Sequence, residues 1–136
     1  MTTNWKRPTP RITPESKAYW KAAADGVMTL AKCDNCGKIH HHPQAVCPFC
    51  WSSEIKAIPS SGAGSVVSFS VVHQTAVAQF RDKVPYVVAY VKLDEGPQLV
   101  TSIVNCEVDA VQIDMRVQVQ FDKISDDVAI PVFAPA

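Results

Sequence analysis

The stretch CDNCGKIHHHPQAVCPFC, residues 33–50, contains four of the five cysteines and three of the four histidines in the chain. The cysteines form two Cys-x-x-Cys pairs, Cys33 with Cys36 and Cys47 with Cys50, separated by ten residues. A gap of two residues lets one tight turn direct two thiolates at one point, and two facing turns supply a tetrahedron. The spacing therefore predicts that all four cysteines bind one metal ion, and it favours structural zinc.

This stretch is open to other interpretations. A single Cys-x-x-Cys can be a thioredoxin-like redox motif, but that motif opens a helix after a strand, and here there are two pairs. The histidines at 40–42 could replace a cysteine; because four thiolates already fill a tetrahedron, we expect them to line the tip of the ribbon. The spacing does not exclude iron. Since a closed zinc shell has no open position, the stretch is expected to be a scaffold and not a catalytic centre.

The composition is that of an ordinary globular protein. The chain has 136 residues, enough for one domain or a small domain with an added module, with 47% apolar and 19% charged residues. The apolar run at 87–91 is too short to span a bilayer. We therefore expect a cytoplasmic protein without a membrane segment, and in a reducing compartment clustered cysteines favour metal binding over disulfides.

The charge is unevenly divided although the net charge is zero. Residues 1–50 carry seven Lys and Arg against three Asp and Glu, whereas residues 51–136 carry six against ten. This division suggests two modules with different neighbours, and plain solvation of exposed charges is an equal alternative. Zero net charge argues against a dedicated nucleic-acid-binding protein.

A helix is predicted within TPESKAYWKAAADG, residues 13–26. Thr13 suits the N-cap, Pro14 suits the first helical position and Gly26 suits the stop, which gives about three turns. Tyr19 and Trp20 give this short element a wide apolar surface. That surface either packs on the chain itself, with Trp20 capping the barrel core, or docks on a partner.

The remaining chain is predicted to be extended. Prolines in residues 1–12 favour an arm, and short strands are expected on either side of the cysteines, within 27–33 and 51–59. Alternation with period two predicts five further strands, with DEGP at 94–97 as a hairpin turn. These five strands are expected at 64–74, 85–94, 97–105, 116–124 and 129–133.

The predicted fold class is mainly β, with an N-terminal helix, a rubredoxin-like zinc ribbon and a five-stranded OB-fold barrel. Closure into a barrel removes exposed strand edges, and the OB-fold is the most economical closed arrangement of five short antiparallel strands. The arm and helix are assigned to residues 1–30, the ribbon to 31–57 and the barrel to 58–136.

No catalytic residue is predicted. Cys106 is a lone thiol at a strand end and is expected to be a small core residue, while His73 is expected to be a surface histidine. Asp94 and Glu95 are adjacent in a turn, so their carboxylates should point apart and not form an acid–base pair. Phosphate-binding loops, nucleophile elbows and metalloprotease motifs are absent from the sequence.

Several segments together resemble a known family, the zinc-ribbon plus OB-fold acyl-CoA-associated proteins that accompany thiolase-like enzymes. The resemblance runs from Ile12 to Phe121 and rests on YWKAAADGVMTL, CDNCG, CPFC, SGAGSVVSFSVVH, VPYVVAYVKLDEGPQLVTSIV and MRVQVQF. The chain departs from the family pattern at two places. One is IHHHPQAV, between the two Cys-x-x-Cys turns, which are called knuckles, and the other is Asp114, where a glycine is common. Neither departure involves a cysteine.

The resemblance implies a non-catalytic subunit that binds beside a thiolase-like partner, which would supply the nucleophile. Thiolytic cleavage, condensation or retro-aldol cleavage of acyl-CoA thioesters is the implied chemistry. A basic ribbon and helix suit the phosphates of coenzyme A, and an apolar barrel mouth suits the acyl group. We expect the loop containing Phe80, Arg81, Lys83 and Tyr86 to meet the acyl-CoA or the partner, the alternative being a solvated loop.

Two further hypotheses belong to other classes of protein. Zinc ribbons and OB-folds both occur in nucleic-acid-binding proteins, but the chain offers neither the basic charge nor the many strand aromatics that single-strand binding requires. A standalone redox or iron protein would be revealed by visible-light absorption. The acyl-CoA subunit is the preferred interpretation.

Overall fold

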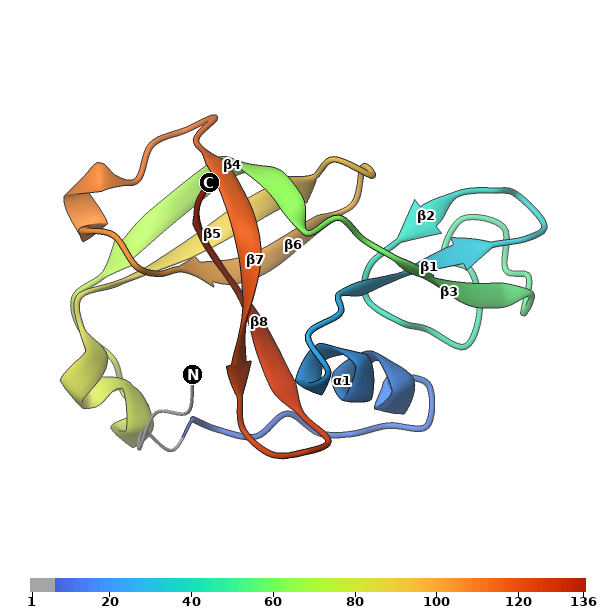
Figure 1. Cartoon of the computed structure of the whole chain (residues 1–136), viewed down its shortest axis with the longest axis horizontal. Helices are drawn as coiled ribbons and strands as arrows, with labels where there is room; N and C mark the ends of the chain where they lie inside the picture. The colour runs from blue at the N-terminus through green and yellow to red at the C-terminus, as the bar shows by residue number, and fades with distance from the viewer. Residues whose placement is uncertain (1–6) are drawn as a thin grey trace.

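The computed structural model describes residues 7–136, in which a small sheet and a barrel lie on either side of a helix (Figure 1). The helix α1 spans Lys17–Ala24, and the 3-10 helices η1 and η2 span Ala78–Lys83 and Val108–Ala110. The strands are β1 Thr29–Cys33, β2 Ile39–His40, β3 Ile55–Pro59, β4 Ala63–Val72, β5 Tyr86–Leu93, β6 Gln98–Ile103, β7 Arg116–Lys123 and β8 Ala129–Pro135. Within residues 7–136, no helix combines the length and apolarity needed to cross a membrane.

The strands form two separate sheets. The small sheet has the order β2-β1-β3 with antiparallel pairs, and it carries the cysteine stretch. The other five strands close into a barrel in the order β4-β5-β6-β8-β7, with β7 pairing back to β4. The predicted fold class, a mainly β chain with a helix, a ribbon and a five-stranded OB-fold barrel, is confirmed. Six residues of the predicted N-terminal arm, 1–6, lie outside the described residues.

The barrel core follows directly from the alternating sequence. Every second residue of β5 points inward, and all four inward residues are at most 2% exposed. A one-residue slip would turn this whole set outward, so the hydrophobic pattern fixes the register of the strand. The buried side chains of the core include Val66, Val87, Ala89, Val91, Leu93, Leu99, Ile103, Val117 and Phe133.

Two backbone positions restrict which residues fit. A Cβ atom at Gly64 would lie 2.6 Å from the carbonyl oxygen of Lys92, so β4 and β5 can approach this closely only with glycine. Asp114, where the resembling family commonly has glycine, has a φ of 67°. Aspartate is one of the few residues that tolerate this left-handed conformation, which explains how it replaces glycine there.

The helix starts later than predicted. Thr13 is not the N-cap, because α1 begins at Lys17 with Ser16 at the cap position, and residues 14–16 form a turn before it. Ser16 is only 3% exposed, and its hydroxyl accepts a hydrogen bond from the backbone N–H of Thr13 at 2.9 Å. The predicted stop is correct, since Gly26 follows the helix with a φ of 83°. The helix therefore has about two turns instead of three.

The aromatic residues of α1 mainly serve the chain itself. Tyr19 is 5% exposed and its hydroxyl is hydrogen-bonded to Nε2 of His41 at 2.9 Å, so it is not available as a docking anchor. Trp20 is partly buried and packs edge-on against Tyr19, with ring centroids 5.0 Å apart. Of the three histidines, His40 is 4% exposed and His41 is partly buried, whereas His42 is exposed. The histidines and the helix instead form the junction between ribbon and barrel.

The connection from ribbon to barrel is anchored by the hairpin turn between β5 and β6. Glu95 accepts hydrogen bonds from the hydroxyl of Ser60 at 3.0 Å and from the backbone N–H of Ser61 at 2.7 Å. Burial raises the pKa of this carboxyl, but the hydrogen bonds from Ser61 and Ser60 outweigh it and hold the pKa below its ordinary value. The ionised carboxylate thus holds Ser60 and Ser61, two of the three residues that join the two sheets.

His41 makes the stability of this junction dependent on pH. Burial, followed by the nearby His42 and His40, lowers the pKa of His41 to about 4, whereas an unfolded histidine has a pKa of about 6.5. As the pH falls below about 6.5, the unfolded chain takes up the proton first, so stability is lost on acidification. Between about pH 7.5 and 5.5 we expect a loss of about 1 kcal/mol in the free energy of unfolding.

Urea unfolding at both pH values, with the metal content measured in parallel, tests this expectation. His41→Gln should reduce the pH dependence, because the amide does not titrate. His73→Gln, at an exposed position, is the matched control and should leave it unchanged. Identical pH dependence in all three proteins would contradict the assignment to His41.

Candidate metal centre and barrel pocket

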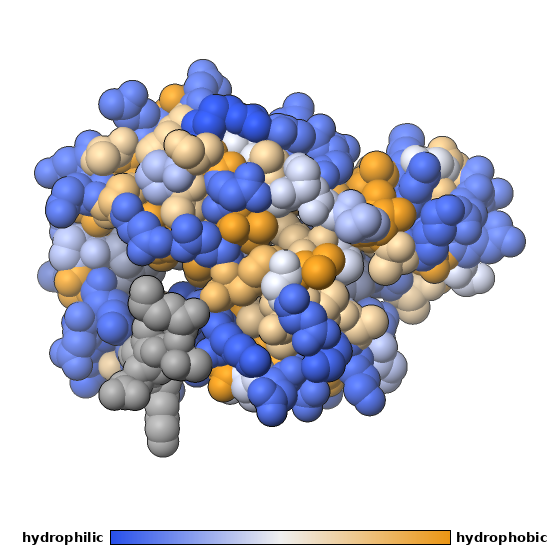
Figure 2. Space-filling model, in the orientation of Figure 1, coloured by the Kyte–Doolittle hydropathy of each residue, from blue (hydrophilic) through white to orange (hydrophobic). Residues whose placement is uncertain are grey.

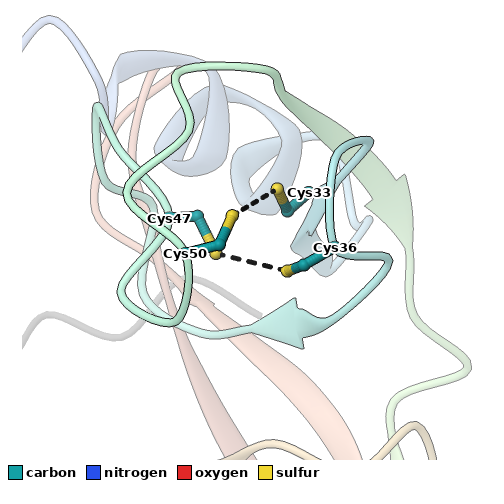
Figure 3. A group of neighbouring side chains, drawn as sticks. All are labelled: Cys33, Cys36, Cys47 and Cys50. Atoms are coloured by element: carbon teal, nitrogen blue, oxygen red, sulfur yellow. Dashed lines mark hydrogen bonds between the residues drawn. The ribbon is translucent and has the colours of Figure 1, made fainter.

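Four cysteine sulfurs converge at one end of the ribbon sheet (Figure 3). Their Sγ atoms all lie within 4.8 Å of one another, with Cys33 to Cys50 at 3.6 Å and Cys36 to Cys47 at 3.7 Å. Four sulfurs at the usual zinc–sulfur distance of about 2.3 Å form a tetrahedron with edges of about 3.8 Å. The four thiols are not joined as disulfides, and they are arranged for metal binding.

The two knuckles have the same backbone geometry. In the first, the N–H of Gly37 donates to the carbonyl of Cys33 at 2.8 Å, and in the second the N–H of Trp51 donates to the carbonyl of Cys47 at 2.9 Å. Both donors have positive φ angles, 75° for Gly37 and 69° for Trp51. Glycine adopts this conformation freely, whereas a tryptophan there is strained. The second knuckle therefore keeps a bulky residue where the first has none.

Two of the four sulfurs accept hydrogen bonds from N–H groups outside the cluster. The side-chain amide of Asn35 donates to Sγ of Cys50 at 3.4 Å, and the backbone N–H of Phe49 donates to Sγ of Cys47 at 3.4 Å. The Asn35 amide, followed by the backbone N–H of Ser52, lowers the pKa of the Cys50 thiol to about 6. Because a thiolate is the form that binds metal, these hydrogen bonds favour the metal-binding form of Cys50. At Cys36 the backbone hydrogen bond with Lys38 lowers the pKa of the thiol, but burial and the neighbouring sulfurs outweigh it and raise the pKa to about 11.

The donor set fits zinc as a structural ion. Four thiolates close the coordination shell, so a zinc ion held there would stabilise the fold and leave no position for a substrate. Among residues 7–136, this is the one group of three or more potential ligands whose atoms come so close together. The neighbouring histidines at 40–42 do not join it.

A separate pocket of about 470 Å³ lies on the side of the barrel. It brings together three of the four loop residues that sequence reasoning selected: Phe80, Lys83 and Tyr86 line it, whereas Arg81 is exposed and does not. The loop itself forms the 3-10 helix η1, which the sequence did not indicate. The other lining residues are Arg7, Val88, Val100, Thr101, Ser102, Val104, Ile130, Pro131 and Val132.

The remaining candidates for chemistry have structural surroundings. Asp94 forms two hydrogen bonds of 2.8 Å with the guanidinium of Arg116, while its neighbour Glu95 binds the ribbon–barrel connection, so the carboxylates point apart as predicted. Cys106 is partly buried and packs against the barrel core. His73 is exposed at the end of β4.

Sequence reasoning missed the exposed aromatic residues of the second knuckle. Trp51 is 81% exposed and Phe49 is 53% exposed, although both are large apolar side chains. The sequence CPFCW, residues 47–51, could have indicated this exposure. The residue that directly follows a Cys-x-x-Cys knuckle lies on the outer side of the turn. A surface of this kind is typical of protein interfaces.

The metal site yields a direct prediction. Cys47→Ser should abolish the binding of one zinc ion per chain and unfold the ribbon, since metal binding in such sites supplies folding free energy on the order of 10 kcal/mol. Elemental analysis and thermal melting measure both effects. Cys106→Ser is the matched control and should retain zinc; unchanged zinc content in Cys47→Ser would refute the assignment.

Two family models match the chain, and the boundary between them falls within β3. A model described as the rubredoxin-like zinc ribbon domain of ChsH2 matches residues 20–55, and one described as the C-terminal OB-fold domain of ChsH2 matches residues 57–122. A chain of the solved Ltp2-ChsH2(DUF35) aldolase is similar with a TM-score of 0.82 and 31% identity, covering 93% of this chain and 98% of that one.

Three relatives extend the comparison. A DUF35 domain-containing scaffold protein of Methanocaldococcus jannaschii is 37% identical over 71% of this chain and 68% of its own length. The benzoylsuccinyl-CoA thiolase subunit BbsA of Geobacter metallireducens is 31% identical over 88% of this chain and 80% of its own length. A probable enoyl-CoA hydratase alpha subunit of Thermomonospora curvata is 33% identical over 96% of this chain, which spans 40% of that protein.

The ribbon, the barrel and their order along the chain are thus shared with these proteins across most of the sequence. The chain therefore belongs to the ChsH2-type DUF35 family of zinc-ribbon and OB-fold proteins.

Proposed function

We propose that this protein is a zinc-binding, non-catalytic subunit of a thiolase-like enzyme that acts on acyl-CoA thioesters in the cytoplasm. The observation that carries the proposal is the similarity of nearly the whole chain to one chain of the Ltp2-ChsH2(DUF35) aldolase. A relative that covers most of the chain is named as a subunit of a thiolase. Thiolytic cleavage, condensation or retro-aldol cleavage is the reaction class, with the chemistry on the partner.

The internal contacts of the chain support a non-catalytic role. The thiols of the ribbon point at one another, and the adjacent carboxylates are each engaged in structural hydrogen bonds. A partner enzyme would then supply the nucleophile and base, while this subunit contributes to acyl-CoA binding and to the stability of the complex.

Contact with acyl-CoA is assigned to the barrel pocket. Phe80 and Tyr86 lie with ring centroids 5.4 Å apart at its edge, and Lys83 provides a cation there. In five-stranded OB-folds, ligands commonly bind on the face of the second and third strands beside the loop that joins the first two. Here those strands are β5 and β6, and η1 lies in that loop.

Trp51 is our candidate for the anchor on the partner enzyme. It is highly exposed and is kept in a left-handed backbone conformation that costs a non-glycine residue about 1 kcal/mol or more. The equivalent position of the first knuckle is Gly37, which makes the same backbone hydrogen bond without this strain. An aromatic residue of this kind suits an interface hot spot.

Trp51→Gly separates binding from folding. Because glycine relieves the backbone, the variant should retain zinc and change the free energy of unfolding by no more than about 1 kcal/mol. Its affinity for the proposed thiolase-like partner should fall by about 30-fold or more, measured by titration and co-purification. Trp20→Ala, which removes a partly buried ring, should instead lower the melting temperature.

Ile113→Ala, at an exposed apolar position on the barrel, is the control and should affect neither quantity. Unchanged partner affinity in Trp51→Gly would remove Trp51 from the interface. Failure of the unmodified chain to bind any thiolase-like enzyme would overturn the proposed function itself.

A second prediction concerns the remaining thiol. Cys106 is partly buried against the core and has the character of a small apolar residue. Cys106→Ala should therefore leave the acyl-CoA turnover of the complex within a few-fold of the unmodified protein. Loss of turnover in a folded, zinc-containing Cys106→Ala complex would mean that this chain contributes the nucleophile.

A further inference from the structure

A second pocket, the ribbon pocket, has a volume of about 290 Å³ and lies between α1 and the ribbon sheet. All three strands of that sheet line it, together with Ala18 and Tyr19 of α1 and with Pro43 and Gln44 from the segment after β2. Figure 2 shows hydrophobic residues where the ribbon meets the barrel and hydrophilic residues over the outer end of the ribbon. The ribbon pocket shares no lining residue with the barrel pocket.

Small side chains create the space of the ribbon pocket. Ala31 in β1 lies directly opposite His40 in β2 and directly opposite Ala57 in β3. Directly paired residues of antiparallel strands point to the same face of a sheet, so these three side chains form a row across the ribbon. Ala18 and Ala45 also line the pocket, and the four alanines leave a hollow beside the imidazole of His40.

His40 is the buried polar side chain of this pocket. It is 4% exposed, and neither Nδ1 nor Nε2 has a hydrogen-bond partner among residues 7–136. Burial lowers the pKa of His40, so its ring is neutral near pH 7, with one nitrogen that donates and one that accepts. Buried polar atoms of proteins nearly always have a partner, as His41 does in the hydroxyl of Tyr19. A ligand that hydrogen-bonds to His40 would supply one.

The charges around the pocket favour an uncharged ligand. The charged lining residues Glu15 and Lys56 are both exposed, and Nζ of Lys56 lies 3.0 Å from a carboxylate oxygen of Asp34. His41 is neutral, because burial and then the nearby histidines lower its pKa to about 4. An ion beside His40 would therefore lose its hydration against alanine side chains. A hydroxyl group can either donate or accept, so it suits whichever ring nitrogen it meets.

We propose that the ribbon pocket binds a small uncharged alcohol or phenol, whose hydroxyl hydrogen-bonds to His40 and whose apolar body packs on the alanines. The volume of about 290 Å³ is at the lower end of the range for pockets that bind small molecules, which suits a compact ligand. This site is independent of the acyl-CoA subunit role, because it lies on another part of the chain and requires no partner enzyme.

Four probes that share a benzene ring test this assignment. The full-length, zinc-loaded chain is titrated with phenol, toluene, benzoate and benzylamine, and NMR follows the ring signals of His40 and the backbone amide signals of Ala31 and Ala57. Phenol and toluene are similar in size and differ only in the hydroxyl. Phenol should therefore bind about fivefold more tightly than toluene, the ratio expected for one hydrogen bond to a buried group. Neither benzoate nor benzylamine should shift the His40 signals.

Matched variants connect this preference to the pocket. His40→Phe keeps a ring but has no nitrogen, so phenol should lose its advantage over toluene. Ala57→Leu, at an exposed position, should fill part of the hollow and weaken both probes by about tenfold, and it tests the location even where His40→Phe does not fold. Ala110→Leu, at an exposed alanine of η2 outside the ribbon pocket, is the control and should bind like the unmodified chain. Zinc content and melting temperature show whether each variant is folded.

Three results would overturn the assignment. One is the absence of any His40 shift with phenol up to about 20 mM, and another is equal or tighter binding of toluene or of either ion. The third is a phenol response confined to Val88 and Val100, which would place the probe in the barrel pocket. None of these results bears on the subunit role, which co-purification with a thiolase-like enzyme tests separately.

Discussion

The convergence of four cysteine sulfurs is the constraint on which the ribbon depends. The three strands of the small sheet contain only twelve residues, and the segment between β2 and β3 has no strand of its own. Such a short stretch buries too little apolar surface to fold by itself, and small domains of this kind rely on a metal or a disulfide. Cys33 and Cys47 are completely buried, so the sulfur cluster takes the place of a hydrophobic core.

The barrel has a conventional core, and its connection to the ribbon is short and fixed. Glu95 reaches from the β5–β6 turn to the residues between the sheets, and Lys21 of α1 donates to the backbone carbonyl of Asp126 beyond β7 at 3.0 Å. These contacts, with Tyr19 against His41, join the helix and both sheets. The exposed second knuckle and the barrel pocket are therefore displayed by one connected framework, as a subunit that contacts both partner and ligand would require.

Features that depend on local spacing could be predicted from the sequence. The Cys-x-x-Cys pairs predicted the ribbon, and the alternation of valines predicted all five barrel strands because period two determines which face is buried. The start of α1 was wrong by a few residues because Thr13 and Ser16 hydrogen-bond to each other and close a turn before the helix begins. Tyr19 looked like an interface residue because its partner, His41, lies 22 positions away in the sequence. The pocket was only partly predictable, since its floor joins β6 with β8 and Arg7.

The strand order has a consequence for how the protein forms during synthesis. β8 lies between β6 and β7, and it also packs against α1, although it follows both of its neighbours in the chain. The ribbon, by contrast, is complete by Pro59. On the ribosome, the ribbon can therefore collect its four sulfurs first, while the barrel waits as an open four-stranded sheet with two unpaired edges. Such an intermediate exposes strand edges to wrong partners, and early association with another subunit would protect it.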